Sequence, residues 1–344
     1  MKRFLPYILI GLVVLIVFVA FPLYQRVFSP AVSIEGDEPY FLLIPNGADY
    51  IYVAETLKRD KIITNPQGFQ WVARRMNYPR SIRPGRYKIE DGMSNRELIQ
   101  LLRSGQQTAV RFTFVKFRRP EDFALHAAQY FEFGKTELMA VLNNREFLKK
   151  EFNLTPETVF TIIIPNTYEI WWNTPPEEFI KRMYKEYRAF WGRNGRREAR
   201  QRMRLTRQEV MTLASIVEEE TIRNDERPKV AGVYLNRIRK SMPLQADPTV
   251  KFAVGNFELR RILNEHLEID SPYNTYKYPG IPPGPICTPS ITSIDAVLAN
   301  ERHKYYYFCA KTDGSGYHHF SKTLMEHNMY ANQYHQMLNQ KGIR

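Results

Sequence analysis

The feature that most constrains this chain is an uncharged apolar stretch at its N-terminus. Residues 4–25 contain no charged side chain and are rich in Leu, Ile, Val and Phe. About 20 such residues, each rising about 1.5 Å in a helix, match a hydrocarbon core of roughly 30 Å. A cleaved signal peptide is the competing interpretation, but its apolar region is usually only about 7–15 residues long. We therefore predict a single retained transmembrane helix over residues 4–25.

The basic residues beside this stretch predict its orientation. Lys2 and Arg3 precede it and only Arg26 follows closely, and the more basic flank of a span usually stays in the cytoplasm. Residues 1–3 are then a cytoplasmic tail, and the rest of the chain lies outside the cytoplasmic (inner) membrane. The net charge of +13 favours a polyanionic partner. For an exported domain we expect a cell-wall polymer or a membrane surface, and not nucleic acid.

Two strand-turn-helix patterns follow the apolar stretch. In the first, residues 41–44 form a short apolar run, a Pro-Asn-Gly turn follows, and residues 50–57 have helical spacing. In the second, Ser94 and Glu97 fit a capping box at the start of an amphipathic helix. Such units are typical of small binding modules, and equally of spacers. We assign residues 36–112 to one strand-helix module.

Residues 113–205 are predicted to be a linking α/β region. We expect a strand at Phe112–Phe117, a helix over residues 118–133 and a buried strand at Ile162–Tyr168. Residues 181–207 then contain eleven basic and two acidic side chains, an excess of +9. Glycines at 192 and 195 should divide this stretch into two basic helices. The charge is compatible with a solvated helix face or with a surface that guides an anionic polymer.

A helix with three consecutive glutamates carries the candidate chemistry. Thr206 and Glu209 form a second capping box, and the apolar stripe of the helix consists of Val210, Leu213, Ala214, Val217 and Thr221. Glu219 should point away from this stripe into water, whereas Glu218 and Glu220 flank it. A carboxyl group at such a boundary is partly desolvated, which raises its pKa toward that of a general acid. We prefer Glu218 as the acid and keep Glu220 as the alternative; a plain surface role is the competing interpretation.

Polar and aromatic loops downstream strengthen this interpretation. The segments 244–249 and 271–276 are rich in Gln, Asn, Thr and Tyr, and a rigid Gly-Pro segment follows at 280–286. Aromatic faces can stack on sugar rings while amides bind hydroxyl groups. The candidate substrate-binding residues of these loops are Gln245, Asp247, Thr249, Tyr273 and Asn274.

Together these motifs resemble the endolytic murein transglycosylase family (YceG-like, MltG type). The resemblance rests on residues 214–221, 244–249, 271–276 and 284–286 and on residues 313–323 with 326–328, and it covers nearly the whole chain. It implies an α+β fold with an N-terminal LysM-like module over residues 36–112 and a catalytic domain over residues 206–344. It places the family's motif glutamate at Glu218, and the last motif adds His318 and Ser321 to the candidate substrate-binding residues. The chain departs from the usual motifs at Phe117–Glu121, Asn166 and Tyr317.

The resemblance also implies a chemistry. Members of the family cleave the β-1,4 bond between N-acetylmuramic acid and N-acetylglucosamine inside peptidoglycan strands and leave 1,6-anhydro ends, without a metal or another cofactor. Peptidoglycan synthases are then possible partners. The sequence agrees with the lack of a metal, since no His-Glu-x-x-His or Cys-x-x-Cys motif occurs. Cys287 and Cys309, the only cysteines, exclude a disulfide scaffold.

Two alternatives remain open from the sequence. A hydrolytic muramidase would need a second carboxylate to hold a water molecule, and Asp247 is the candidate. A non-catalytic murein-binding scaffold of the synthesis machinery would leave Glu218 with a structural role only.

Overall fold

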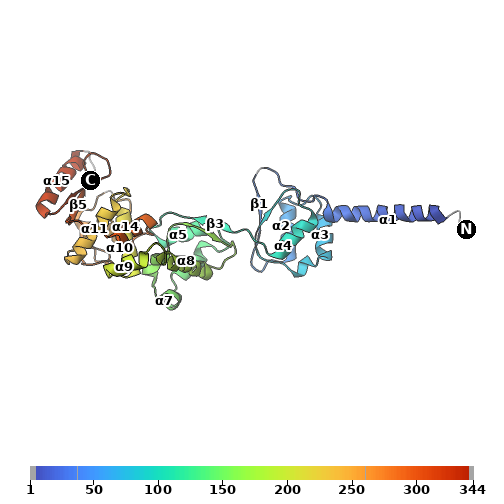
Figure 1. Ribbon diagram of the computed structural model, residues 1–344, viewed down its shortest axis with the longest axis horizontal. Helices are drawn as coiled ribbons and strands as arrows, with labels where there is room; N and C mark the ends of the chain where they lie inside the picture. Colours follow the sequence, from blue (N-terminus) through green and yellow to red (C-terminus); the bar gives the residue numbers. More distant parts are fainter. Residues whose placement is uncertain (1–4, 37, 260, 341–344) are drawn as a thin grey trace. The chain divides into compact units, whose positions relative to one another are not determined.

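The computed structural model describes residues 5–36, 38–259 and 261–340. These residues form two compact units. Unit 1 contains the described residues up to Arg111, together with residues 130–133 and 169–175. Unit 2 contains residues 112–129, 134–168 and everything described from Pro176 onward. Helices and strands occur in both units, so the chain has the mixed α+β composition that we expected (Figure 1).

Unit 1 begins with one long apolar helix and continues as a small strand-helix body. Its elements are α1 (Leu5–Phe28), β1 (Tyr40–Ile44), α2 (Tyr50–Arg59), α3 (Pro66–Arg75), the 3-10 helix η1 (Tyr78–Arg80), β2 (Gly85–Ile89) and α4 (Asn95–Ser104). β1 and β2 pair antiparallel, with Leu42 opposite Tyr87. The two strands and α2–α4 enclose an apolar core that includes Leu57, Phe69 and Leu98. The predicted capping box of Ser94 and Glu97 is confirmed.

The N-terminal helix is long and apolar enough to cross a membrane. The qualifying segment runs from Leu9 to Phe28, with a mean hydropathy of 2.1 and no buried side chains. The helix therefore extends a few residues beyond the predicted end at residue 25. Lys2 and Arg3, on which the predicted orientation depends, lie outside the described residues.

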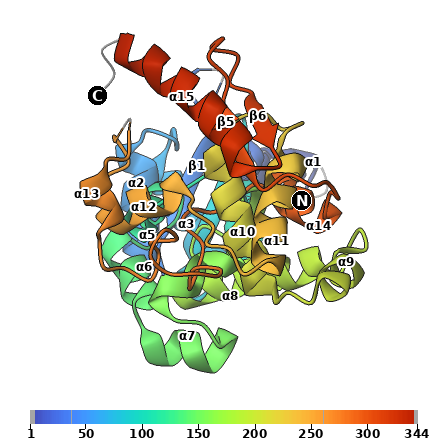
Figure 2. The ribbon, with the colours of Figure 1, turned by 90° about the vertical axis from the view of Figure 1, so that its left-hand side faces the viewer.

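Unit 2 is predominantly helical. Its elements are α5 (Pro120–Ala127), α6 (Lys135–Leu142), α7 (Arg145–Phe152), the 3-10 helix η2 (Pro156–Ile162), α8 (Pro176–Trp191), α9 (Arg196–Met203), α10 (Arg207–Glu220), α11 (Arg227–Arg239), α12 (Asp247–Val254), α13 (Asn264–Leu267), α14 (Ile291–Ala299), β5 (Tyr307–Ala310), β6 (His318–Ser321) and α15 (Leu324–Gln340). α10, α11 and α14 pack against one another, and the β5–β6 hairpin contacts α15 (Figure 2). Most of α10 is therefore buried, from Val210 to Val217.

Several predicted elements of the linking region need correction. The strand β3 runs only from Val110 to Thr113 and pairs with β4 (Thr167–Ile170). The predicted helix over 118–133 is the shorter α5, and the apolar residues at Ile162–Ile164 belong to and follow η2, so the strand predicted there is wrong. Short buried apolar runs fit both helix and strand, which is why periodicity alone misassigned this one. The predicted break between two basic helices is confirmed, since α8 ends at Trp191 and α9 starts at Arg196.

Candidate active site

Helix α10 carries three glutamates at its C-terminal end. The capping box of Thr206 and Glu209 starts the helix as predicted, and the helix ends at Glu220. The last turn of a helix carries a partial negative charge, so carboxylates there are unfavourable unless donors or cations compensate them. Successive side chains project about 100° apart, and each of the three glutamates accordingly meets a different set of partners.

Glu218 is hydrogen-bonded to neighbouring helices and is not among the residues that line the cavity at Glu220. Its carboxylate accepts from Arg227 Nη2 at 3.1 Å and from Ser293 Oγ at 2.7 Å, and the hydroxyl and backbone N–H of Ser290 also donate to it. The side chain is 11% exposed. These donors come from α11, from α14 and from the residue that caps α14. The geometry therefore fits a structural tie between three helices, which disfavours our sequence-based preference for Glu218 as the acid.

Glu219 does not point into water, and that prediction is wrong. Lys116 Nζ lies 2.9 Å and Arg118 Nη2 2.7 Å from its two carboxylate oxygens, and its side chain is only 13% exposed. Burial pushes the pKa of Glu219 upward, but hydrogen bonds from Arg118 and Lys116 outweigh it and leave the pKa below its usual value. The segment before α5 supplies both cations, and no local pattern around residue 219 could have indicated it.

Glu220 lines a cavity of about 520 Å³ in unit 2. The hydroxyl of Tyr234, from α11, donates to its Oε1. Burial raises the pKa of Glu220 to about 8, and the charge of Asp247 also raises it, whereas the Tyr234 hydrogen bond, Lys251 and Arg237 act in the opposite direction. Glu220 is therefore mostly protonated near neutral pH, as a general acid must be.

The cavity collects residues from distant parts of unit 2. Three of the predicted substrate-binding residues, Gln245, Asp247 and His318, line it. The hydroxyl of Tyr276 donates a hydrogen bond to Asp247 Oδ1. Besides Glu219, sequence reasoning missed several lining residues, namely Tyr234, Arg237, Lys251, Tyr276, Phe308, His327 and His335. Tyr276 and His327 lie inside motifs that we had singled out. Tyr234 and Arg237 are one helical turn apart on α11, and no sequence motif marks them as residues of a site.

Four other predicted substrate-binding residues are not brought to the cavity. Thr249 and Asn274 are fully buried, and Tyr273 and Ser321 are 8% and 1% exposed. Asn274 Nδ2 donates to the carbonyls of Leu267 and Ile269 at 2.7 and 3.0 Å. Thr249 Oγ1 donates to the carbonyl of Ala246 at 2.7 Å. Asn274 and Thr249 thus satisfy buried backbone groups and shape the loops that present Gln245 and Asp247.

Arg237 holds the loop that carries Gln245. Its guanidinium donates to the carbonyl of Tyr306 at 2.7 Å, to the carbonyl of Leu244 at 2.7 Å and to Gln245 Oε1 at 3.3 Å. Gln245 itself has a left-handed backbone conformation, with φ of 49°, which is unusual for a residue with a Cβ atom. The buried arginine therefore stabilises a conformation that places the Gln245 side chain at the cavity.

Contacts with the buried side chain of Glu226 position His318. His318 Nδ1 lies 2.8 Å from Glu226 Oε2, and its backbone N–H donates to Glu226 Oε1 at 3.0 Å. Arg223 also donates to the carbonyl of Ser315 in the preceding loop. These contacts fix the start of β6 against the segment that joins α10 to α11.

The described residues contain no group of three or more His, Cys, Asp or Glu side chains placed to hold a metal ion. Cys287 and Cys309 are both free thiols in the structure, and Cys287 is buried. Around Glu220 the cavity presents hydrogen-bonding and titratable side chains, among them Tyr234 and Asp247.

The model of the YceG-like family matches residues 42–333. This chain belongs to the YceG-like family. The family resemblance inferred from the motifs is thereby confirmed, and the matched range includes every residue that lines the cavity except Tyr334 and His335.

Curated proteins and a solved structure agree with this membership. An endolytic murein transglycosylase from Bacillus subtilis (strain 168) is 33% identical in an alignment of 318 positions, and the alignment covers 87% of this YceG-like chain and 85% of the relative. Another from Streptococcus pneumoniae (serotype 2, strain D39) is 25% identical over 86% of this chain and 59% of the longer relative. The crystal structure of a YceG-like protein from Listeria monocytogenes superimposes with a TM-score of 0.55, at 28% identity, and covers 86% of this chain and 99% of the other.

Proposed function

We propose that this YceG-like protein is an endolytic lytic transglycosylase of peptidoglycan, with Glu220 as its acid and base. The observation that carries the proposal is a glutamic acid with a pKa of about 8 at a cavity that also holds Asp247, Gln245 and His318. The names of the relatives, endolytic murein transglycosylases, supply the substrate class. Glu220 replaces Glu218, our sequence-based preference, because the Glu218 carboxylate is occupied by donors from other helices.

The proposed reaction needs only one carboxyl group. Protonated Glu220 donates its proton to the oxygen that links N-acetylmuramic acid to the next N-acetylglucosamine, the C1–O4 bond breaks, and positive charge develops at C1. The Glu220 carboxylate then takes the proton of the muramyl 6-hydroxyl, whose oxygen attacks C1 and closes the 1,6-anhydro ring. Glu220 ends protonated, and no water is consumed. Intramolecular attack is favoured over attack by water when the sugar is held in a productive pose.

The other cavity residues have supporting roles in this proposal. Tyr234 donates to Glu220 and steadies the carboxylate formed after the first proton transfer. Gln245 and His318 are candidates to bind sugar hydroxyl and acetamido groups. Asp247, which accepts a hydrogen bond from Tyr276, is the candidate to stabilise the developing positive charge. No metal or other cofactor takes part in the proposed steps.

Mass spectrometry of purified glycan strands digested with the protein tests the proposal. Products that end in 1,6-anhydro-N-acetylmuramic acid are expected. Reducing ends would instead support a hydrolytic muramidase, for which Asp247 at the same cavity is the second carboxylate. Binding of strands without any cleavage would support a non-catalytic murein-binding scaffold.

We also propose how the protein is placed in the cell. Helix α1 would anchor it in the cytoplasmic membrane with residues 1–3 in the cytoplasm, and the rest of unit 1 and all of unit 2 would lie outside. Residues 36–112 would act as a LysM-like module, residues 113–205 as a linking region and residues 206–344 as the catalytic domain. Cleavage beside the membrane would release nascent strands and so end their elongation, with peptidoglycan synthases as partners. Protease protection of inverted and right-side-out vesicles tests the orientation.

A further inference from the structure

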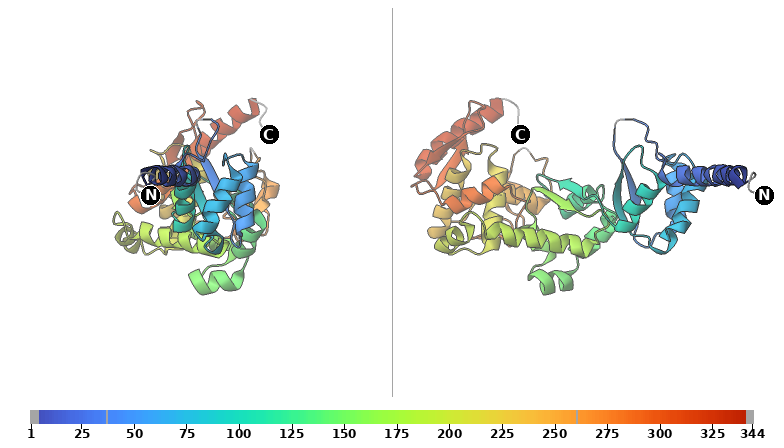
Figure 3. Two further views of the ribbon diagram at one scale, coloured as in Figure 1. Left: turned by 90° about the vertical axis from the view of Figure 1, so that its right-hand side faces the viewer. Right: turned by 45° about the vertical axis from the view of Figure 1, so that its right-hand side comes forward.

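The end of α1 is locked to the folded body of unit 1. The buried side chain of Asn95 donates to the backbone carbonyl of Arg26 at 2.9 Å, and the N–H groups of Ala31 and Val32 both donate to the carbonyl of Met93 at 2.9 Å. The last carbonyls of a helix have no partner within the helix, so Asn95 satisfies one that would otherwise be free. α1 also packs against α3 and α4 (Figures 1 and 3). The position of α3 relative to the end of α1 is therefore fixed.

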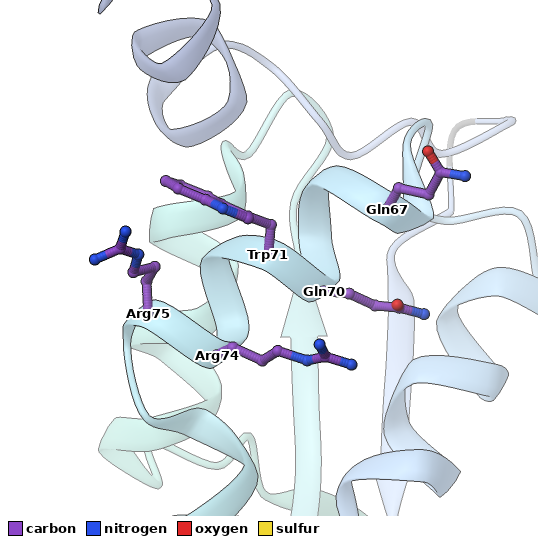
Figure 4. Close-up of a pocket in the computed structure, with 5 residues that line it drawn as sticks. All are labelled: Gln67, Gln70, Trp71, Arg74 and Arg75. Carbon is purple, nitrogen blue, oxygen red and sulfur yellow. The ribbon is translucent and has the colours of Figure 1, made fainter.

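The exposed face of α3 carries a shallow pocket of about 390 Å³ (Figure 4). The residues that line it, Gln67, Gln70, Trp71, Arg74 and Arg75, recur at the i, i+3, i+4, i+7 and i+8 positions of one helix face. The opposite face, with Phe69 and Val72, is buried in the core. The Trp71 ring is half-buried, and the Arg75 guanidinium lies 5.4 Å from its centroid. An amphipathic aromatic ring and two guanidinium groups thus share one accessible surface.

Both charged residues that line this pocket are positive. Arg74 and Arg75 are exposed, and neither forms an ion pair with any described residue. Arg26 in the last turn of α1 and Arg96, whose guanidinium lies 5.3 Å from the Phe28 ring centroid, are exposed as well. Helices α1 and α3 contain no acidic residue, and Glu97 of α4 is engaged in the capping box with Ser94. The two arginines of the pocket therefore have no counter-charge among its lining residues or on α1 and α3.

The place of this surface beside α1 indicates its partner. The apolar segment of 20 residues that ends at Phe28 spans about 30 Å, the thickness of a hydrocarbon core. Side chains around Phe28 then lie at the level of the lipid headgroups, where tryptophan is enriched and where basic residues attract anionic lipids. Guanidinium groups bind phosphate oxygens in a two-pronged geometry.

We propose that the α3 face formed by Gln67, Gln70, Trp71, Arg74 and Arg75 binds the phosphate headgroups of anionic phospholipids in the bilayer that α1 spans. The proposal rests on α1 being a membrane anchor. It assigns to unit 1 a lipid contact in addition to the anchor, which holds the module against the membrane surface. A soluble glycan is the other chemistry that a tryptophan and two arginines could bind, and quenching by labelled lipid separates the two.

The test uses the full chain in nanodiscs of phosphatidylcholine, with or without phosphatidylglycerol. A spin label on a minor fraction of the lipid headgroups quenches nearby tryptophans, and the difference between the wild type and Trp71→Phe isolates the signal of Trp71. We expect the Trp71 signal to be quenched roughly two-fold more with phosphatidylglycerol than without it. Arg75→Gln should lower this difference, and the double change Arg74→Gln with Arg75→Gln should abolish it. Arg103→Gln, which removes an exposed arginine two turns beyond Arg96 on α4, should leave it unchanged.

The quenching experiment can overturn the lipid site without bearing on the proposed glycan cleavage. A Trp71 signal that is not quenched in incorporated protein overturns the lipid site, as does a Trp71 signal that responds to soluble glycan fragments but not to labelled lipid. Failure of the chain to enter nanodiscs overturns the anchor and this proposal together. Glu220→Gln should not alter the quenching, since Glu220 belongs to the cavity of unit 2.

Discussion

Glu218 and Glu220 are two residues apart, and their surroundings predict opposite effects of the same substitution. Glu220→Gln removes the proton donor but keeps an acceptor for Tyr234, so the fold should persist while cleavage falls by about 10²- to 10⁴-fold. Glu218→Gln weakens a buried pair with Arg227 and should lower the free energy of unfolding by about 1–3 kcal/mol. Cleavage per folded molecule should stay close to that of the wild type. Glycan digestion and chemical denaturation of both variants measure the two effects.

Glu219→Gln completes the comparison. Its partners Lys116 and Arg118 are 34% and 40% exposed, so only a small loss of stability, about 0.5–1 kcal/mol, is expected. If Glu218→Gln abolished cleavage in a folded protein and Glu220→Gln did not, the assignment of the acid would be wrong.

The raised pKa of Glu220 predicts two pH effects. Because the acid must be protonated, kcat/KM should fall as pH rises through about 8. The unfolded chain loses this proton near the ordinary glutamate pKa, whereas the folded protein keeps it up to about 8. The folded state therefore binds more protons between these values, and the contribution of Glu220 makes stability fall there by at most ~1.4 kcal/mol per pH unit.

Thermal unfolding of Glu220→Gln across this pH range measures the second effect. The variant should gain stability relative to the wild type between pH 5 and pH 8 and keep a constant advantage above pH 9. An unchanged difference between the two proteins from pH 5 to pH 9 would contradict the raised pKa.

At the level of elements, one residue of the basic stretch holds helices together. Arg196, in the first turn of α9, is only 8% exposed and pairs with Asp295 of α14 at 2.7 Å. Asp295→Asn leaves this buried guanidinium without its carboxylate and should cost about 1–3 kcal/mol of stability. Glu186→Gln is the control, because its i,i+4 pair with Arg182 on α8 is partly exposed, at 28% and 40%, and should cost only about 0.3–0.5 kcal/mol. Urea denaturation of the two variants compares them, and equal losses would argue against a structural role for Arg196.

Features that depend on residues close in the sequence, such as the start of a helix, were predictable. Features that depend on residues far away in the sequence, such as the surroundings of a glutamate, were not. The helices capped by Ser94 and Thr206 start where their capping boxes predicted, because each box joins residues only three positions apart. The choice between Glu218 and Glu220 depends on Arg227, Ser293 and Tyr234, which other helices bring near. Periodicity reports only which side of a helix is buried, and not which donors lie there.

The roles of the loop residues also could not be predicted from the sequence alone. Asn274 and Gln245 are both amides in the loop motifs, and both were predicted to bind substrate. Asn274 is buried and bonds two backbone carbonyls, whereas Gln245 lies at the cavity. An amide in a loop satisfies either its own backbone or a ligand, and only the folded loop decides which.

The whole molecule consists of two compact units, each with buried apolar residues of its own. Units of this kind unfold separately when few contacts join them. We expect two transitions in calorimetry of the detergent-solubilised protein. Leu57→Ala in unit 1 and Leu213→Ala in unit 2, both almost fully buried, should each lower one transition only, with losses of about 2–5 kcal/mol. A single transition that both changes shift equally would show that the units unfold together.

The acidic run at the end of α10 has one further consequence. Each glutamate owes its surroundings to its angle around the helix axis, so inserting or deleting one residue within α10 rotates the run by about 100°. An insertion would bring Glu219 to the angle of Glu220, and a carboxyl group would still face the cavity. A deletion would bring Thr221 there instead, and the proton donor would be lost. The position of Glu220 would thus still hold a glutamate after a one-residue insertion, but not after a one-residue deletion.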